Sequence, residues 1–311
     1  MVTPSKRREV VRFLKSRGHS ERRACTLASL HRSTCQYEHR RVDDPELVAR
    51  LRELASERPR YGYRRLHVLL RRDKRWKAVN RKRLYRIYKT AGLAVRRRSR
   101  KKVRVTRPAP PAPVTRPNER WSMDFVHDSL ADGRTFRTFN VVDAYTRECL
   151  AIEVDTSLPA ARVVRVLDKL VWLHGLPVSL RVDNGPEFIS MTLEAWATKH
   201  GVKLDFIQPG KPTQNAHVES FNARFRDECL AQARFPTLAR ARAEIEIYRV
   251  DYNRVRPHSS LDYQTPEAFG VIARSEVSPS AGPAGALFEV ELPAPDSRLD
   301  RNPDPNQIEV H

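Results

Sequence analysis

A cluster of five prolines between residues 108 and 117 is the feature that most constrains how this 311-residue chain folds. Proline has a fixed φ and no backbone N–H, so such a stretch cannot continue a helix or pair inside a sheet. We interpret residues 108–117 as a semi-rigid, extended linker and as the clearest domain boundary in the chain. The residues on either side of it are therefore expected to fold as separate units.

Positive charge is concentrated ahead of this linker. Residues 1–107 hold 35 Lys and Arg against 9 Asp and Glu, whereas the rest of the chain holds 23 against 28. A one-signed, helical region indicates neutralisation of nucleic-acid phosphates. The four cysteines show no framework spacing, no apolar run approaches a membrane span, and the N-terminus has no apolar signal segment. These features predict a cytoplasmic protein that does not enter a membrane.

The N-terminal region is predicted to be entirely helical. Residues 1–40 have the rhythm of short helices separated by turns, typical of a helix-turn-helix segment. Residues 41–107 form a second, basic, DNA-binding unit in which leucines recur at helical spacing, as in residues 46–57. Asn80 is the expected cap of a helix that ends near Gly92. The outer face of that helix carries the basic residues that we expect at DNA: Arg81, Lys82, Arg83 and Arg86.

Beyond the linker the pattern changes from helical to mixed. Three strands follow one another from residue 120 onwards, and the first two are joined through the turn Ala131-Asp132-Gly133. Helices and strands then alternate. Residues 118–270 therefore predict an α/β domain with a mixed sheet and helices on both faces. Residues 271–311, rich in Pro and Ser, predict a disordered tail.

Three acidic residues lie where such a fold brings side chains together. Asp124 is in the middle of the first strand, Asp183 ends a short buried strand, and Glu219 lies near the start of a helix. Three carboxylates at one sheet edge repel one another unless cations lie between them. Their hard oxygen atoms favour Mg²⁺ or Mn²⁺ over Zn²⁺, and two such ions support in-line phosphoryl transfer. Because 37 of the 311 residues are acidic, the residues around the acids carry more weight than their spacing.

Those surrounding segments are WSMDF, RVDNGPEF and QPGKPTQNAHVESFNARFRDECL. They resemble the OrfB transposases of the insertion sequence three family, which belong to the retroviral-integrase superfamily and have a ribonuclease H-like core. In this chain 35 residues separate Asp183 from Glu219, and Arg226 follows Glu219 by seven positions, as in the family pattern. The segments YGYRRLHVLLRR and YNRVRPHSSLDYQTPEAF also match, so the resemblance runs from about residue 20 to residue 270. One departure is Ala216, where many relatives have Gly, and it affects only the flexibility of the loop.

The resemblance implies an enzyme that cuts and rejoins DNA strands to move a bacterial insertion element. It implies that Asp124, Asp183 and Glu219 are the catalytic residues and hold two Mg²⁺ or Mn²⁺ ions. The implied partners are DNA, both element ends and target, and further copies of the chain assembled on that DNA. Family members are commonly also made as fusions with an OrfA protein that carries a leucine zipper. This chain has no heptad run at its start, so we expect the OrfB part alone, with OrfA as a partner or fusion.

Several more residues are expected at the DNA. Asn222 and Arg226 follow Glu219 at helical spacing and extend its face towards a phosphate. The loop before that helix supplies three more candidates: Lys211, Gln214 and Asn215. Taken alone, these residues favour an ordinary solvated loop and helix face, and it is the resemblance that favours contact with DNA.

Other groups are assigned no chemistry. Four residues near the N-terminus lack the close pairs of a structural zinc site: His19, Cys25, His31 and Cys35. Asp143 is a rival first metal ligand, and otherwise either supports the site or faces solvent. Trp121 and Trp172 are expected in the core.

Two other functions are weighed against a transposase. One is a nuclease of the same fold that hydrolyses RNA–DNA hybrids, for which the long basic helical region is unnecessary. The other is a DNA-binding repressor with a decayed catalytic core, and the complete set of three acids argues against it. A strand-transfer assay with Mg²⁺ separates all three.

Overall fold

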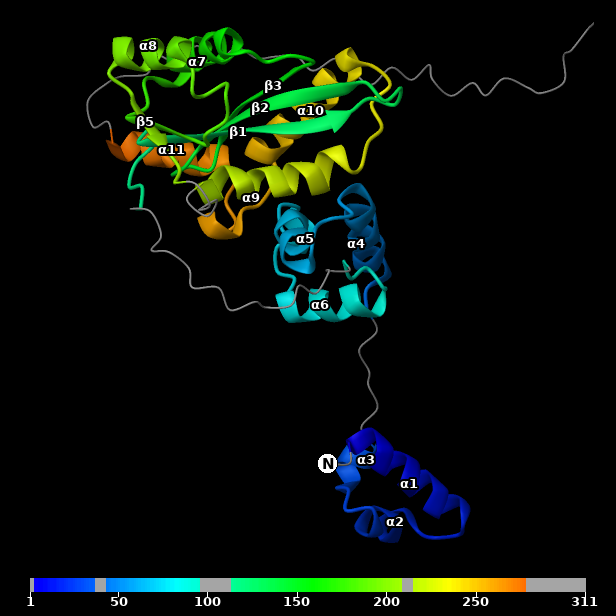
Figure 1. Cartoon of the computed structure of the whole chain (residues 1–311). Helices are drawn as coiled ribbons and strands as arrows, with labels where there is room; N and C mark the ends of the chain where they lie inside the picture. Colours follow the sequence, from blue (N-terminus) through cyan, green and yellow to red (C-terminus); the bar gives the residue numbers. More distant parts are fainter. Residues whose placement is uncertain (1–2, 37–42, 96–112, 209–214, 278–311) are drawn as a thin grey trace, which may run out of the picture.

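Ahead of the proline-rich linker, the residues that the structure describes form helices (Figure 1). The structure, a computed structural model, describes residues 3–36, 43–95, 113–208 and 215–277. Most of the proline-rich linker lies outside these residues. The helices ahead of the linker are α1 (Pro4–Ser16), α2 (Glu21–Leu27), α3 (Arg32–Gln36), α4 (Pro45–Glu57), α5 (Tyr63–Leu70) and α6 (Arg81–Thr90).

The first three helices enclose a small apolar cluster. Ser20 caps α2, because its hydroxyl accepts a hydrogen bond from the Arg23 N–H at 3.4 Å. Gly18 precedes this cap with a φ of 87°, a left-handed conformation that favours glycine in the turn between α1 and α2. The cluster consists of Val11, Ala24, Cys25 and Leu30. Cys25 is thus a packing residue of this short helical segment.

Helices α4, α5 and α6 pack around a second, leucine-rich core. Asn80 caps α6 as the sequence predicts, because its Oδ1 accepts the Lys82 N–H at 2.7 Å. Gly92 follows the helix with a φ of 70°. The buried residues of this core include Leu47, Leu51, Leu66, Leu70, Leu84 and Ile87. The apolar faces that helical spacing indicated are therefore the faces that pack.

The rest of the described chain forms a five-stranded mixed sheet with helices. Its elements are β1 (Arg120–Ser129), β2 (Thr135–Asp143), β3 (Cys149–Asp155), α7 (Ala160–His174), β4 (Ser179–Val182), α8 (Met191–His200), β5 (Lys203–Phe206), α9 (Ala216–Phe225), α10 (Leu238–Arg254) and α11 (Pro266–Val277). The strand order is β3-β2-β1-β4-β5. The first three strands are antiparallel, and β4 and β5 run parallel to β1. This confirms the expected ribonuclease H-like α/β core preceded by a helical region.

Each face of the sheet is covered by its own helices. Trp121, Met123 and Phe139 belong to the cluster that α7 and α8 cover. Val126 and Val142 belong to the cluster that α9 and α10 cover. Because side chains alternate along a strand, the even-numbered residues of β1, Asp124 among them, face α9.

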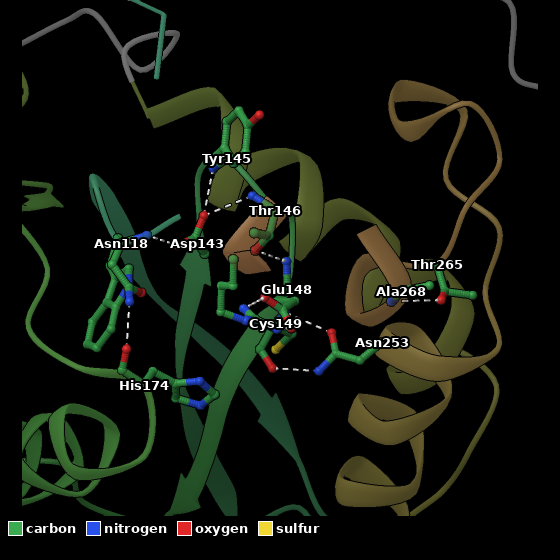
Figure 2. Close-up of polar contacts among 12 residues, drawn as sticks. Asn118, Asp143, Tyr145, Thr146, Glu148, Cys149, His174, Asn253, Thr265 and Ala268 are labelled. Carbon is green, nitrogen blue, oxygen red and sulfur yellow. Dashed lines mark hydrogen bonds and ion pairs between the residues drawn. The ribbon is translucent and has the colours of Figure 1, made fainter. Parts of the chain in front are cut away.

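A β-bulge adjusts this alternation at the sheet edge. The register of β2 with β3 shifts between Val141, which pairs with Ala151, and Val142, which pairs with Cys149. The extra residue, Leu150, packs on the α7 side together with Ala151. Cys149 consequently faces α10, where the Asn253 amide accepts from its N–H and donates to its C=O, both at 2.9 Å (Figure 2).

One expectation about the core was wrong. Trp121 is fully buried, but Trp172 is 83% exposed. The buried face of α7 is formed by Val163, Val166, Leu167 and Leu170. Trp172 lies two residues beyond Leu170, roughly 200° around the helix, and so points away from the sheet. Its aromatic character suggested burial, whereas its place in the helical period decides its exposure.

The helical unit α4–α6 contacts the α/β core directly. In Figure 1, α5 lies beside α9. Arg58 pairs with Asp251 of α10 at 2.5 Å, and Arg65 of α5 pairs with Glu228 at 3.1 Å. The Arg72 guanidinium also donates to the Val255 C=O at 2.8 Å. The contacts between the two units are thus largely arginines of the helical unit that meet acidic or carbonyl oxygens of the core.

The C-terminal helix extends past the boundary at residue 270 that the sequence suggested. Helix α11 runs to Val277, and Arg274 within it binds the Glu148 carboxylate through two hydrogen bonds of 2.7 and 3.0 Å. Phe269 of the same helix packs against Tyr145 with ring centroids 5.6 Å apart, so α11 docks against the β2–β3 connection. Within the described part of the chain, no helix is both long and apolar enough to cross a membrane.

Candidate active site

Asp124 lies in the middle of β1 and is half-buried beneath α9. Its cross-strand partner on β2 is Asn140. One carboxylate oxygen accepts the Phe125 N–H at 2.8 Å, and the other accepts the Asn222 side-chain N–H at 2.8 Å. The carboxylate is thus held from two directions.

A relay of amide side chains supports this carboxylate. The Asn140 side chain donates to the Asn222 Oδ1 at 2.7 Å, and Asn222 in turn donates to Asp124. Asn140 is fully buried and Asn222 is 6% exposed. The sequence placed Asn222 at DNA, whereas the structure places its side chain inside, between the sheet and Asp124. Asn140 was missed because only the strand register, which the sequence does not give, sets it opposite Asp124.

Asp183 and Glu219 flank this position from two other elements. Asp183 immediately follows β4, the parallel neighbour of β1, and its carboxylate accepts the Gly185 N–H at 3.0 Å. Glu219 lies in the first turn of α9 and is exposed. The two buried residues beside it, Val218 and Phe221, anchor α9 to the sheet.

The electrostatics of the three acids are linked. The pKa of Asp124 is raised to about 6, first by burial and then by the charges of Asp183 and Glu219, against the lowering effect of its hydrogen bonds. Burial also raises the pKa of Glu219. Mutual repulsion among hard oxygen ligands is the environment that a divalent cation relieves, so the donor set fits Mg²⁺ or Mn²⁺. Among the described residues, no three His, Cys, Asp or Glu side chains already stand close enough to hold an ion.

Asp143, the rival ligand, has a structural task instead. It is 1% exposed, so it does not face solvent. Its carboxylate accepts the backbone N–H groups of Asn118, Tyr145 and Thr146 at 2.7–2.9 Å (Figure 2). With both oxygens occupied in this way, Asp143 closes the turn after β2 and joins it to the segment that enters β1.

Arg226 is the first residue of a π-helical turn, Arg226–Leu230, that continues α9. It is exposed, two turns beyond Glu219 on the helix. No ion pair or hydrogen bond of its guanidinium is found with the part of the chain that the structure describes. Further along this turn, Glu228 meets Arg65 and Arg256. Glu228 could not be identified from sequence patterns, because both of its partners are distant in the chain.

The remaining candidates are divided between loop and helix. Lys211 and Gln214 lie outside the described residues. Asn215 is buried, and its side-chain N–H donates to the Met123 C=O at 3.2 Å, which fixes the start of α9 to β1. On α6, Arg81, Lys82 and Arg83 are exposed, and Arg86 is half-buried. Asp43 pairs with Arg86 at 2.5 Å and with Arg83 at 3.9 Å.

Comparison with known proteins agrees with this division of the chain. Residues 114–212 and residues 200–266 match the integrase core domain. Residues 42–102, which include α4–α6, match an HTH-like domain.

The relatives are insertion-element proteins. The chain is 49% identical over 258 residues to the IS407 31.7 kDa protein of Burkholderia multivorans, covering 82% of this chain and 92% of that protein. It is 44% identical over 286 residues to the IS476 39.2 kDa protein of Xanthomonas euvesicatoria, covering 91% and 82%. Transposase InsD of Escherichia coli is 27% identical over 244 residues, covering 74% and 80%. The chain therefore belongs to the OrfB transposases of the insertion sequence three family.

Proposed function

We propose that this transposase cleaves and joins DNA strands at divalent metal ions held by Asp124, Asp183 and Glu219. The observation that carries the assignment is the position of Asp124 in the middle of β1, half-buried, between Asp183 at the end of β4 and Glu219 at the start of α9; burial, and then the charges of these two acids, raises its pKa. The three acids come from β1, the end of β4 and the start of α9. A set of acids in this arrangement gains most from bound cations.

The protein residues have separate parts in this chemistry. Two Mg²⁺ or Mn²⁺ ions would supply activation of a water or 3′-hydroxyl and stabilisation of the leaving oxygen in phosphoryl transfer. Asn222 and Asn140 keep one oxygen of Asp124 oriented, so that its remaining lone pairs face the site. Arg226 is exposed beyond Glu219 and is suited to hold a phosphate beside the scissile bond.

Binding of DNA is divided between the two units. The exposed basic residues of α6 contact the phosphate backbone of the element ends, and the core contacts the scissile phosphate and the target. Copies of the chain assemble on that DNA, with OrfA as an additional partner or fusion, in the cytoplasm. Lys211 and Gln214, which precede α9 in the chain, are further candidates for contact with DNA.

Substitution of Asp183 tests the metal assignment. Asp183→Asn keeps the shape of the side chain but replaces one ligand oxygen with an amide, so we expect strand cleavage and joining with Mg²⁺ to be lost while DNA binding is kept. Asp155→Asn is the matched control, because Asp155 lies at the end of β3 and pairs with Arg242 at 2.9 Å. Full strand-transfer activity of Asp183→Asn would exclude this residue from the metal site.

A further inference from the structure

A cationic cavity of about 250 Å³ lies between the helical unit and the catalytic core, beside α9. Its wall combines a residue of α5, the turn after β2, one side of α9 and the segment after α10. The residues that matter here are Arg65, Arg147, His217, Ser220, Arg224 and Arg256. His217, Ser220 and Arg224 share one side of α9, and Glu219 lies roughly 130° further around the helix.

Two of the four arginines share a single carboxylate. Arg256 is 1% exposed and binds Glu228 through hydrogen bonds of 2.6 and 2.7 Å. Arg65 donates to the same carboxylate at 3.1 Å. The single negative charge of Glu228 is therefore shared by two guanidinium groups at the back of the cavity.

The other two arginines face the cavity without an acidic partner among the described residues. The Arg147 guanidinium contacts the ring of His217, which is a neutral or cationic group and never an anion. Asp143 influences Arg147 through its charge, but its oxygens are occupied by three backbone N–H groups. Arg224 donates only to the C=O and hydroxyl of Ser220, at 2.6 and 2.5 Å.

This combination of groups fits one class of ligand. A half-buried guanidinium that lacks a counter-charge is costly, and an anion relieves that cost. Arginine forks and serine hydroxyls, including those of Ser259 and Ser260 at the rim, are the donors that recognise tetrahedral oxyanions. Among the described residues no carboxylate forms an ion pair with Arg147 or Arg224, so their remaining N–H donors are available for such a ligand.

We propose that this cavity binds one phosphate of the DNA backbone where the DNA crosses from the helical unit to the catalytic core. The proposal rests on the proposed function, which makes DNA the substrate. Ser220 directly follows Glu219 in α9, so the cavity lies within about one helical turn of one of the proposed catalytic acids. Arg65 belongs to the helical unit, so the same phosphate contacts both units at once.

Binding to a DNA duplex at increasing salt tests the proposal. Log K falls as log salt rises, and each lost phosphate contact makes this negative slope shallower by about 0.9 and weakens binding to all sequences alike. Arg147→Gln and Arg224→Gln should each bind a 30-base-pair duplex about tenfold more weakly at low salt, with this smaller slope. The matched control is Arg165→Gln, an exposed arginine of α7 on the opposite face of the sheet. Affinities and slopes equal to those of the control would overturn the proposal.

A second measurement separates this cavity from the proposed function. Inorganic phosphate, compared with chloride at equal ionic strength, should raise the melting temperature of the wild type and of Arg165→Gln but not of Arg147→Gln or Arg224→Gln. If phosphate protects in this pattern while all variants bind DNA equally, the cavity takes free phosphate and the proposal is wrong. If the wild type binds DNA with the expected slopes but transfers no strand, the proposed function fails and the phosphate site stands. Equal melting temperatures of all variants in chloride establish that each is folded.

Discussion

Glu228 offers the most informative single substitution in the contact between the helical unit and the core. Its carboxylate accepts hydrogen bonds from Arg256 at 2.6 and 2.7 Å and from Arg65 at 3.1 Å. The side chains of Glu228 and Arg256 are 9% and 1% exposed. Glu228→Gln keeps the shape and removes the charge, which leaves the guanidinium of Arg256 buried against Tyr61 and Tyr252 with no counter-charge.

The expected loss follows from burial. Removing one partner of a buried ion pair typically costs about 3–5 kcal/mol, because the remaining charge is neither solvated nor neutralised. An exposed pair is worth less than about 1 kcal/mol. Glu244→Gln is the matched control, since Glu244 pairs with an exposed Arg240 one turn away on α10.

Urea unfolding of the full-length chain measures both losses. We expect Glu228→Gln to lower the free energy of unfolding by about 3 kcal/mol and Glu244→Gln by less than about 1 kcal/mol. Combining Glu228→Gln with Arg65→Gln should be less than additive by about 1–2 kcal/mol, because the second change removes a charge that the first has left unpaired. Equal effects of Glu228→Gln and Glu244→Gln would refute the reasoning from burial.

Two further predictions concern the site itself. The pKa of Asp124 is about 6 in the folded protein, whereas that of an exposed Asp is about 3.9. As pH rises, the folded protein therefore keeps this proton longer than the unfolded chain does. In metal-free protein, the free energy of unfolding should fall by about 2–3 kcal/mol between pH 4 and pH 7 because of this group. Asp124→Asn should abolish that contribution, and Mg²⁺ should offset it. Urea unfolding of the wild type and the variant measures this, and the assignment is contradicted if the difference in their stability does not change with pH. Arg226→Ala should lose most strand joining and Arg226→Lys should keep a fraction, because lysine supplies the charge but not the bidentate contact. Joining rates of both variants, measured at one salt concentration, test this. A wild-type rate from Arg226→Ala would exclude Arg226 from the site.

The fold was predictable wherever a local pattern determines the element. The leucines of α4 and α5 and the cap Asn80 needed only helical spacing and a side-chain oxygen. The alternation in β1 and the turn at Gly133 gave the first hairpin, whose strands pair as expected. The prediction that Trp172 is buried was wrong because it gave residue type more weight than the position of the residue in the helical period.

The candidate site was predictable in its acids but not in their supports. Asp124 and Asp183 lie within short segments that the sequence itself displays, and Glu219 within a third. Asn140 becomes a neighbour of Asp124 only through strand register, and Asn222 becomes buried only when α9 packs on β1. Residues that act across more than 80 positions of sequence leave no local pattern to detect.

The π-helical turn that follows α9 has a mechanical consequence. Glu219 and Glu228 lie on one uninterrupted helical rod, separated along its axis by roughly 13 Å. One end of this rod carries an acid of the site, and the other end is clamped by an arginine of the helical unit. A helix is stiff over such a short span, so it transmits rotation and shift with little loss. When DNA moves the helical unit, the position of Glu219 relative to β1 should move with it, so that only a correctly seated DNA end aligns the acids.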